Sequence, residues 1–229
     1  MHKYYLGLKE LDDDVGGIKG GTNILLIGPP LSSKESVLNS VMSYGLGASE
    51  PVILVETRVP GANMLESLSM PGGSAIGIVD CVTRTLGINA RDTPYIKHAT
   101  SPVDLTGVGV RVSQFMEEFG GQDAGRVRLC IDSISTMLMY SNLSTVFRFI
   151  HVITGQVVMR GNLGVYVADE SVLDDQAIST LKQLFNAVLQ VKVENDRTFV
   201  RAVGLTPRPT AWYEYQVVDR RAVIGGGEG

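Results

Sequence analysis

Cysteine, basic charge and histidine are scarce in this 229-residue chain, and each scarcity argues against a class of protein. The two cysteines, Cys81 and Cys130, lie inside apolar runs without metal-ligand spacing, which predicts buried, reduced thiols. Asp and Glu outnumber Lys and Arg by 24 to 20, so the net charge of −4 gives no reason to expect nucleic acid as a partner. The three histidines are far apart and form no ligand pattern.

Long apolar runs are also missing. No run reaches the length of a membrane span, and the first residues, MHKYYLGLKELDDD, lack an apolar signal core. We therefore expect a cytoplasmic protein without a membrane partner. Hydrophobic residues nevertheless make up 44% of the chain and charged residues only 19%, which predicts a sizeable core and little disorder.

Short apolar runs alternate with stretches of helical period along most of the chain. The expected strands are Ile24–Ile27, Val52–Val55, Ile76–Asp80, Val127–Ile131 and Leu163–Ala168. The expected helices are Lys34–Tyr44, Ala62–Ser69, a helix from Pro102 capped by Ser101, a helix over about 144–160 and one over about 174–185. This alternation is typical of an α/β fold whose central, mostly parallel sheet is flanked by helices.

The pattern changes after Asn186. Two apolar runs joined by a polar turn at Glu194–Arg197, followed by YEYQVVDRRAVI, predict an antiparallel C-terminal extension of the sheet. We find no internal repeat and no low-complexity linker. We therefore expect a single domain over residues 1–224 and a flexible Gly-rich tail over residues 225–229.

The stretch NILLIGPPLSSKES has the layout of a phosphate-binding loop, in which a buried strand is followed by a turn and a helix. The first glycine and the lysine of the pattern G-x-x-x-x-G-K-[ST] are present as Gly28 and Lys34. Ser33 replaces the second glycine, and Glu35 replaces the magnesium-binding hydroxyl, with Ser36 one residue later. The candidate nucleotide-binding residues here are Gly28, Pro29, Pro30, Leu31, Ser32, Ser33, Lys34, Glu35 and Ser36.

These replacements should weaken the loop. Serine resists backbone dihedrals that glycine permits, and the Glu35 carboxylate would repel phosphate unless a cation lay between them. About a hundred residues later, the strand in RVRLCIDS ends at Asp132, in the layout of the aspartate that holds magnesium in phosphate-loop NTPases. Asp132 and Glu35 are therefore the candidate magnesium ligands, should a nucleotide bind. We expect the loop and Asp132 to meet at the C-terminal ends of neighbouring strands.

Four stretches carry a resemblance to a known family. They are LGLKELDDDVGGIKGGTNILLIGPP, VILVETRVPGANMLESL, RVRLCIDSISTMLMY and the region from ISTLKQLF to YQVVD. Together they resemble the archaeal KaiC-like branch of the RecA superfamily, which includes GvpD-like, FlaH-like and RadA-related proteins. The resemblance covers nearly the whole chain and implies a RecA-like P-loop NTPase fold. It is strongest to members described as inactivated and linked to signalling.

The resemblance also implies hydrolytic residues that this chain lacks. KaiC-type ATPases carry paired acids after the second strand, and the matching positions here are Thr57 and Arg58. The adjacent Glu56 is the one candidate catalytic base, although we expect it to be a surface charge at a strand end. The basic pair that reaches a neighbouring subunit in the family corresponds to Gly204 and Thr206, with Arg208 nearby.

The favoured hypothesis is a regulatory protein of the signal-transduction type, with weak or absent nucleotide binding and little or no ATP hydrolysis. Such a protein would act through protein partners, as a monomer or dimer rather than a hexamer. Two alternatives stay open. In one, Glu35 and Ser36 rebuild a magnesium site, Glu56 serves as base and the chain is a slow or active ATPase with ATP or ADP as ligand. In the other, it is a RadA-type DNA recombination accessory protein, which the acidic charge disfavours.

Overall fold

The computed structural model describes residues 2–68, 75–120, 126–172 and 175–225. These residues form a ten-stranded sheet. Its strand order is β12-β11-β10-β9-β3-β8-β7-β4-β5-β6. The parallel strands are β3 (Thr22–Gly28), β4 (Val52–Glu56), β5 (Ile76–Asp80), β6 (Ile96–His98), β7 (Arg128–Asp132), β8 (Leu163–Asp169) and β9 (Ala187–Glu194). The antiparallel extension is β10 (Arg197–Val203), β11 (Tyr213–Val218) and β12 (Arg221–Ile224).

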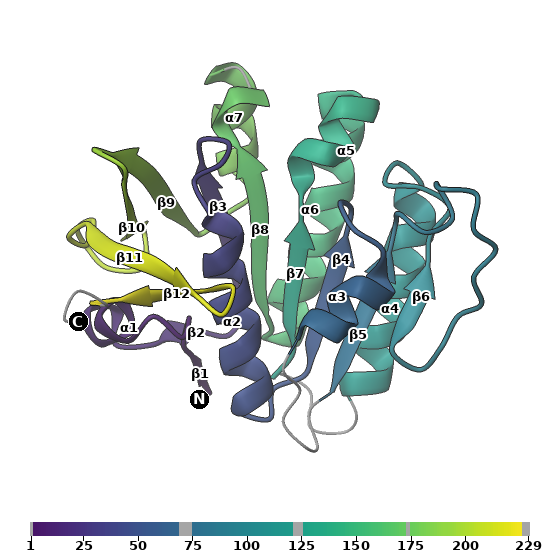
Figure 1. The fold of residues 1–229 in the computed structure, drawn as a ribbon, viewed down its shortest axis with the longest axis horizontal. Helices are drawn as coiled ribbons and strands as arrows, with labels where there is room; N and C mark the ends of the chain where they lie inside the picture. Colours follow the sequence, from purple (N-terminus) through teal and green to yellow (C-terminus); the bar gives the residue numbers. More distant parts are fainter. Residues whose placement is uncertain (1, 69–74, 121–125, 173–174, 226–229) are drawn as a thin grey trace.

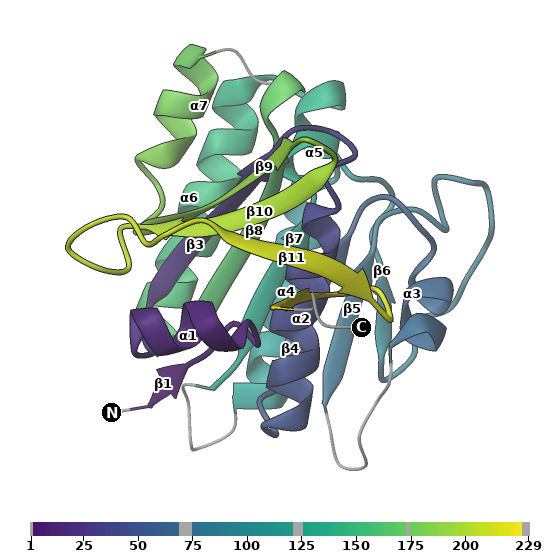
Figure 2. The same ribbon diagram turned by 60° about the vertical axis from the view of Figure 1, so that its left-hand side comes forward.

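Helices cover both faces of the sheet (Figures 1 and 2). On one face lie α1 (Lys9–Val15), α2 (Lys34–Gly47) and α3 (Gly61–Ser67), together with the ribbon of β1 (Lys3–Tyr4) and β2 (Ile18–Lys19). On the other lie α4 (Leu105–Gly120), α5 (Ile134–Tyr140), α6 (Leu143–Arg160) and α7 (Asp175–Lys182), which follows the short turn η1 (Glu170–Val172). Alternate residues of β3 point into the two cores, so both of its faces are buried.

The predicted fold class is confirmed, and each of the five predicted strands is present with ends within two residues of expectation. The helix expected from Pro102 begins instead at Leu105, because Asp104 rather than Ser101 caps it by accepting a hydrogen bond from the Gly107 N–H at 2.9 Å. Residues 69, 174 and 226–229 of the expected helices and tail lie outside the described residues. No helix within the described ranges is long and apolar enough to cross a membrane.

The C-terminal ends of the parallel strands share one edge, and the register brings acidic residues together there. Glu56 on β4 is level with Asp132 on β7, and Asp169 on β8 is level with Gly28 on β3. The expectation that the loop and Asp132 follow neighbouring strands is wrong, because β8 lies between β3 and β7. The intervening strand, β8, therefore adds the carboxylate of Asp169 to the site.

A buried arginine lies at the end of the sheet opposite the candidate site and links several segments there. Arg128, at the start of β7, has no exposed surface and pairs with the buried Glu50, its Nε lying 2.5 Å from the carboxylate. Its Nη1 donates to the Tyr5 carbonyl at 2.6 Å and to the Val41 carbonyl at 3.2 Å. Gly45 on α2 makes room for it, since a Cβ there would lie 2.4 Å from Arg128 Cδ. Arg128 thus ties β7 to α2 and to the N-terminal segment.

Replacing Glu50 with alanine should lower the free energy of unfolding by about 3 kcal/mol, because the buried guanidinium of Arg128 would lose its counter-charge. Urea unfolding at neutral pH measures this. The matched control is Glu118→Ala, which removes the partner of Lys97 in an exposed pair and should cost less than about 1 kcal/mol. Equal losses in the two variants would contradict the structural role of the Arg128–Glu50 pair.

Candidate functional site

The candidate phosphate loop connects β3 to α2, and its backbone is held in place from several sides. Gly28 passes so close to β9 that a Cβ would lie 2.9 Å from Val191. Leu31 and Ser33 adopt left-handed φ angles of 59° and 55°, each at a cost of roughly 1 kcal/mol that glycine would avoid. The Tyr215 hydroxyl of β11 donates to the Ser32 carbonyl at 2.9 Å. The loop therefore keeps left-handed turns although the second glycine is missing.

Two prolines reduce the number of backbone N–H groups that this loop can offer to a phosphate. Pro29 and Pro30 have no backbone N–H, whereas a phosphate cradle is built from such groups. Leu31 is fully exposed at the tip. The Ser36 hydroxyl donates to the Ser33 carbonyl at 2.6 Å, within the first turn of α2. The hydroxyl that the alternative hypothesis gives to the metal thus donates its proton to the loop itself.

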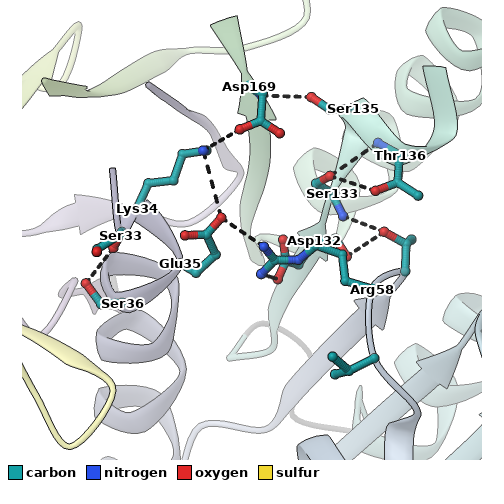
Figure 3. A network of polar contacts seen from close by, with 12 residues as sticks. Ser33, Lys34, Glu35, Ser36, Arg58, Asp132, Ser133, Ser135, Thr136 and Asp169 are labelled. Atoms are coloured by element: carbon teal, nitrogen blue, oxygen red, sulfur yellow. Dashed lines mark hydrogen bonds and ion pairs between the residues drawn. The ribbon is translucent and has the colours of Figure 1, made fainter. Parts of the chain in front are cut away.

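Lys34 is paired from within the chain (Figure 3). Its side chain is 1% exposed, and Nζ forms an ion pair with Asp169 and donates to the Pro29 carbonyl at 3.1 Å. The Glu35 carboxylate lies 3.8 Å away. The backbone of Asp169 is held by α5, because its N–H donates to the Ser135 hydroxyl at 2.7 Å. The lysine expected to hold phosphate thus already has a carboxylate partner.

Arg58, in the loop after β4, lies between the two candidate magnesium ligands (Figure 3). Its Nη1 donates to Glu35 at 2.9 Å and its Nη2 donates to Asp132 at 2.5 Å. Burial acts to lower the pKa of Arg58, but the charges of Asp132 and Glu35 outweigh it and raise that pKa, so the guanidinium stays charged. A fixed cation of this chain therefore bridges the carboxylates that were expected to share a metal ion.

The residues present do not fit a magnesium–nucleotide complex in this arrangement. Both cations of the site, Lys34 and Arg58, are paired with carboxylates, and both candidate metal ligands are paired with Arg58. Among the described residues of the site, the carboxylates of Glu35, Asp132 and Asp169 already outnumber these two cations, and the excess negative charge opposes a phosphate chain. Within the described residues, no group of three or more His, Cys, Asp or Glu is placed to hold a metal ion.

Glu56 is buried, so the expectation of a surface charge is wrong. In a parallel strand covered on both faces, neither side of the strand reaches solvent. Its Oε1 accepts the N–H groups of Arg58 and Val59 at 2.8 and 3.1 Å, and its Oε2 has no partner among the described residues. Burial, followed by the charge of Asp132, raises the pKa of Glu56 to about 7. One oxygen of Asp132, Oδ1, is likewise unpartnered in the described part of the chain.

The other positions matched to hydrolytic residues do not carry the residue types of the family. The Thr57 hydroxyl donates to the Asp132 carbonyl at 2.8 Å and accepts from the Ser133 N–H at 2.8 Å, so it ties β4 to β7. Gly204, Thr206 and Arg208 lie at or beyond the end of β10, where the Thr206 hydroxyl donates to the Arg208 carbonyl at 2.5 Å and Arg208 is exposed. Within the described ranges, no hydrogen bond or ion pair joins the side chains of these three residues to the loop–Asp132 site of the same chain.

Glu56 should make the protein less stable as the pH rises from about 4.5, the pKa of an unperturbed glutamate, to about 7. Between these values the unfolded chain releases a proton that folded Glu56 keeps, a difference on the order of 3 kcal/mol in full. Glu56→Gln should remove this part of the pH dependence and raise stability near pH 8.

Urea unfolding of both proteins at about pH 5 and about pH 8 measures the effect. Glu66→Gln changes an exposed glutamate on α3 and serves as the matched control. An unchanged pH dependence in Glu56→Gln would show that Glu56 titrates normally.

Residues 21–191 match the model of a family of unknown function (DUF7504). No curated protein matches the chain in sequence. The structure is similar to that of the KaiC-like protein PH0186 from the hyperthermophilic archaeon Pyrococcus horikoshii, with a TM-score of 0.68 and 14% identity over 97% of this chain and 98% of that one.

A second similar structure is the uncharacterized protein PH0321 of Pyrococcus horikoshii, solved in complex with an unknown peptide. Its TM-score is 0.68 and its identity 16%, over 96% of this chain and 98% of that one. At such identities the likeness establishes the fold, which is KaiC-like and of the RecA type.

Proposed function

The chain belongs to the DUF7504 family of unknown function, and we propose that it is a regulatory protein of KaiC-like fold with weak or absent nucleotide binding and little or no ATP hydrolysis. The observation that carries this proposal is the guanidinium of Arg58 between Glu35 and Asp132. It supplies from within the chain the positive charge that a magnesium ion supplies in an NTPase.

A magnesium–nucleotide complex would have to displace Arg58 from Glu35 and Asp132. The cost of breaking these two contacts would weaken nucleotide binding substantially. A hydrogen bond between charged groups contributes about 1.5–3 kcal/mol. Because 40% of the Arg58 side chain is exposed, the low end applies. Two such bonds then amount to about 3 kcal/mol, or roughly a hundredfold in the dissociation constant. A nucleotide would also have to compete with Asp169 for Lys34, which adds to this loss.

The chain also offers little help to hydrolysis. General-base catalysis contributes about 10²–10⁴-fold, and the positions that match the family's acids are Thr57 and Arg58. A cation reaching across from a second subunit contributes about 10³-fold or more, and the matching positions are Gly204 and Thr206. We infer that this chain acts by contact with protein partners, as in signal transduction, rather than by turnover.

Isothermal titration with ATP and with ADP, each with and without magnesium, tests the proposal. We expect no saturable heat below millimolar nucleotide and no phosphate release above that of a buffer blank. Lys34→Ala is the matched variant, because it removes the one residue of the loop suited to phosphate. Micromolar binding that disappears in Lys34→Ala would contradict weak binding, and Lys34-dependent phosphate release would establish the ATPase alternative.

Arg58→Ala should uncover a site for divalent cations, because Glu35 and Asp132 would lose the guanidinium that joins them. We expect millimolar magnesium to raise the melting temperature of this variant by several degrees, with no such rise in the unaltered protein. Arg84→Ala, which breaks the pair with Asp92 outside the site, is the control. Equal magnesium responses in all three proteins would contradict the role given to Arg58.

A further inference from the structure

The helices α4 and α6 lie on the face of the sheet opposite α2 (Figure 1). A groove of 670 Å³ lies between them. The two helices run in the same direction, since Gly109 lies beside Phe149 and the Gln156 amide donates to the Ser113 hydroxyl at 3.3 Å. None of the groove residues belongs to the loop–Asp132 site. An inference about this groove therefore does not rest on the proposed nucleotide chemistry.

Both walls of the groove follow helical spacing. The residues on α4 lie in steps of three and four, from Thr106 through Gly109 and Ser113 to Glu117. Those on α6 do the same, from Thr145 through Phe149 and Val152 to Gln156. Such a stripe marks one face of a helix, and two stripes side by side form the kind of surface on which further helices pack.

The stripes are apolar in the middle and charged at the ends. Val110 and Val152 are 50% and 58% exposed near the centre. Arg148 lies toward the N-terminal ends of the two helices and Glu117 toward their C-terminal ends. Both are exposed, and neither makes an ion pair or hydrogen bond within the described ranges. As far as the described residues show, the groove thus presents one positive and one negative charge without an ion-pair partner, on either side of an exposed apolar centre.

This arrangement is complementary to itself. A two-fold axis perpendicular to the helices, through the middle of the groove, reverses their direction in the second copy. Arg148 then faces Glu117 of the partner subunit, the valines meet at the centre, and the helix dipoles oppose one another. An axis parallel to the helices would instead place Arg148 against Arg148 of the partner subunit, which charge repulsion disfavours.

We propose that the α4–α6 groove is a two-fold interface between two copies of this chain, in which four helices pack together and Arg148 of each copy pairs with Glu117 of the other. The interface is of the isologous kind, in which one surface patch serves both subunits. Its apolar centre supplies burial, and the two equivalent charge pairs fix the antiparallel direction of the helices.

Sedimentation equilibrium of the full chain, from low to high micromolar concentration, tests this interface. We expect a dimer that dissociates on dilution. Arg148→Glu and Glu117→Arg should each raise the dissociation constant of the dimer by about tenfold or more. In either variant, the two-fold symmetry brings two pairs of like charges together across the interface. The double variant R148E/E117R restores opposite charges and should return the constant to within about threefold of the original.

Arg221→Glu is the matched control, since it reverses an exposed arginine on β12, beside α2 on the other face of the sheet. It should leave the dissociation constant unchanged, and circular dichroism should show that all the variants are folded. A monomer at every concentration would overturn the proposal. So would a dimer that neither single reversal weakens, or one that the double variant fails to restore.

Discussion

The position of the Arg58 guanidinium is the constraint on which the rest of the site depends. The ends of α2, β4 and β7 bring Glu35, Glu56 and Asp132 to one edge of the sheet, and like charges so placed repel in a medium of reduced dielectric. In a nucleotide-binding protein, a metal ion relieves that repulsion. Here a side chain does so, while burial, followed by the charge of Asp132, still raises the pKa of Glu56 to about 7.

The pairing of Lys34 with Asp169 completes the same arrangement on the other side of Glu35. The parallel register of β3 and β8 sets Asp169 level with Gly28, so the lysine at the start of α2 meets a carboxylate rather than an open cradle. Each cation of the site is satisfied by acids of the same chain. The ion pairs of the site are therefore made within the chain, which fits the weak or absent nucleotide binding that we propose.

Much of the fold could be predicted from the sequence, because strands buried on both faces are continuous apolar runs and the helices between them have their own period. The start of α4 was misplaced because Ser101 and Asp104 are both good capping residues, and only the structure shows which one accepts the hydrogen bond. The strand β6 was not foreseen, since three residues carry too little pattern.

The site was harder to predict than the fold. The sequence identified Lys34, Glu35 and Asp132 as candidates, but it did not pair Arg58 with residues 23 and 74 positions away, nor Lys34 with Asp169. Those contacts depend on strand order, and no local pattern places β8 between β3 and β7. Glu56 was expected at the surface because side chains alternate between the two faces of a strand. Both faces of β4 are buried, so Glu56 is buried whichever face it lies on.

A cation that is part of the chain differs from a bound ion in one further respect. The supply of magnesium or nucleotide in the cell sets how often a diffusible ion occupies its site, whereas Arg58 is tethered two residues beyond β4 and is present at a fixed effective concentration. In the regulatory protein that we propose, the positive charge at this edge of the sheet therefore does not vary with the supply of magnesium or nucleotide. Under that proposal, a signal that reaches the protein through this edge is carried by a protein contact and not by nucleotide.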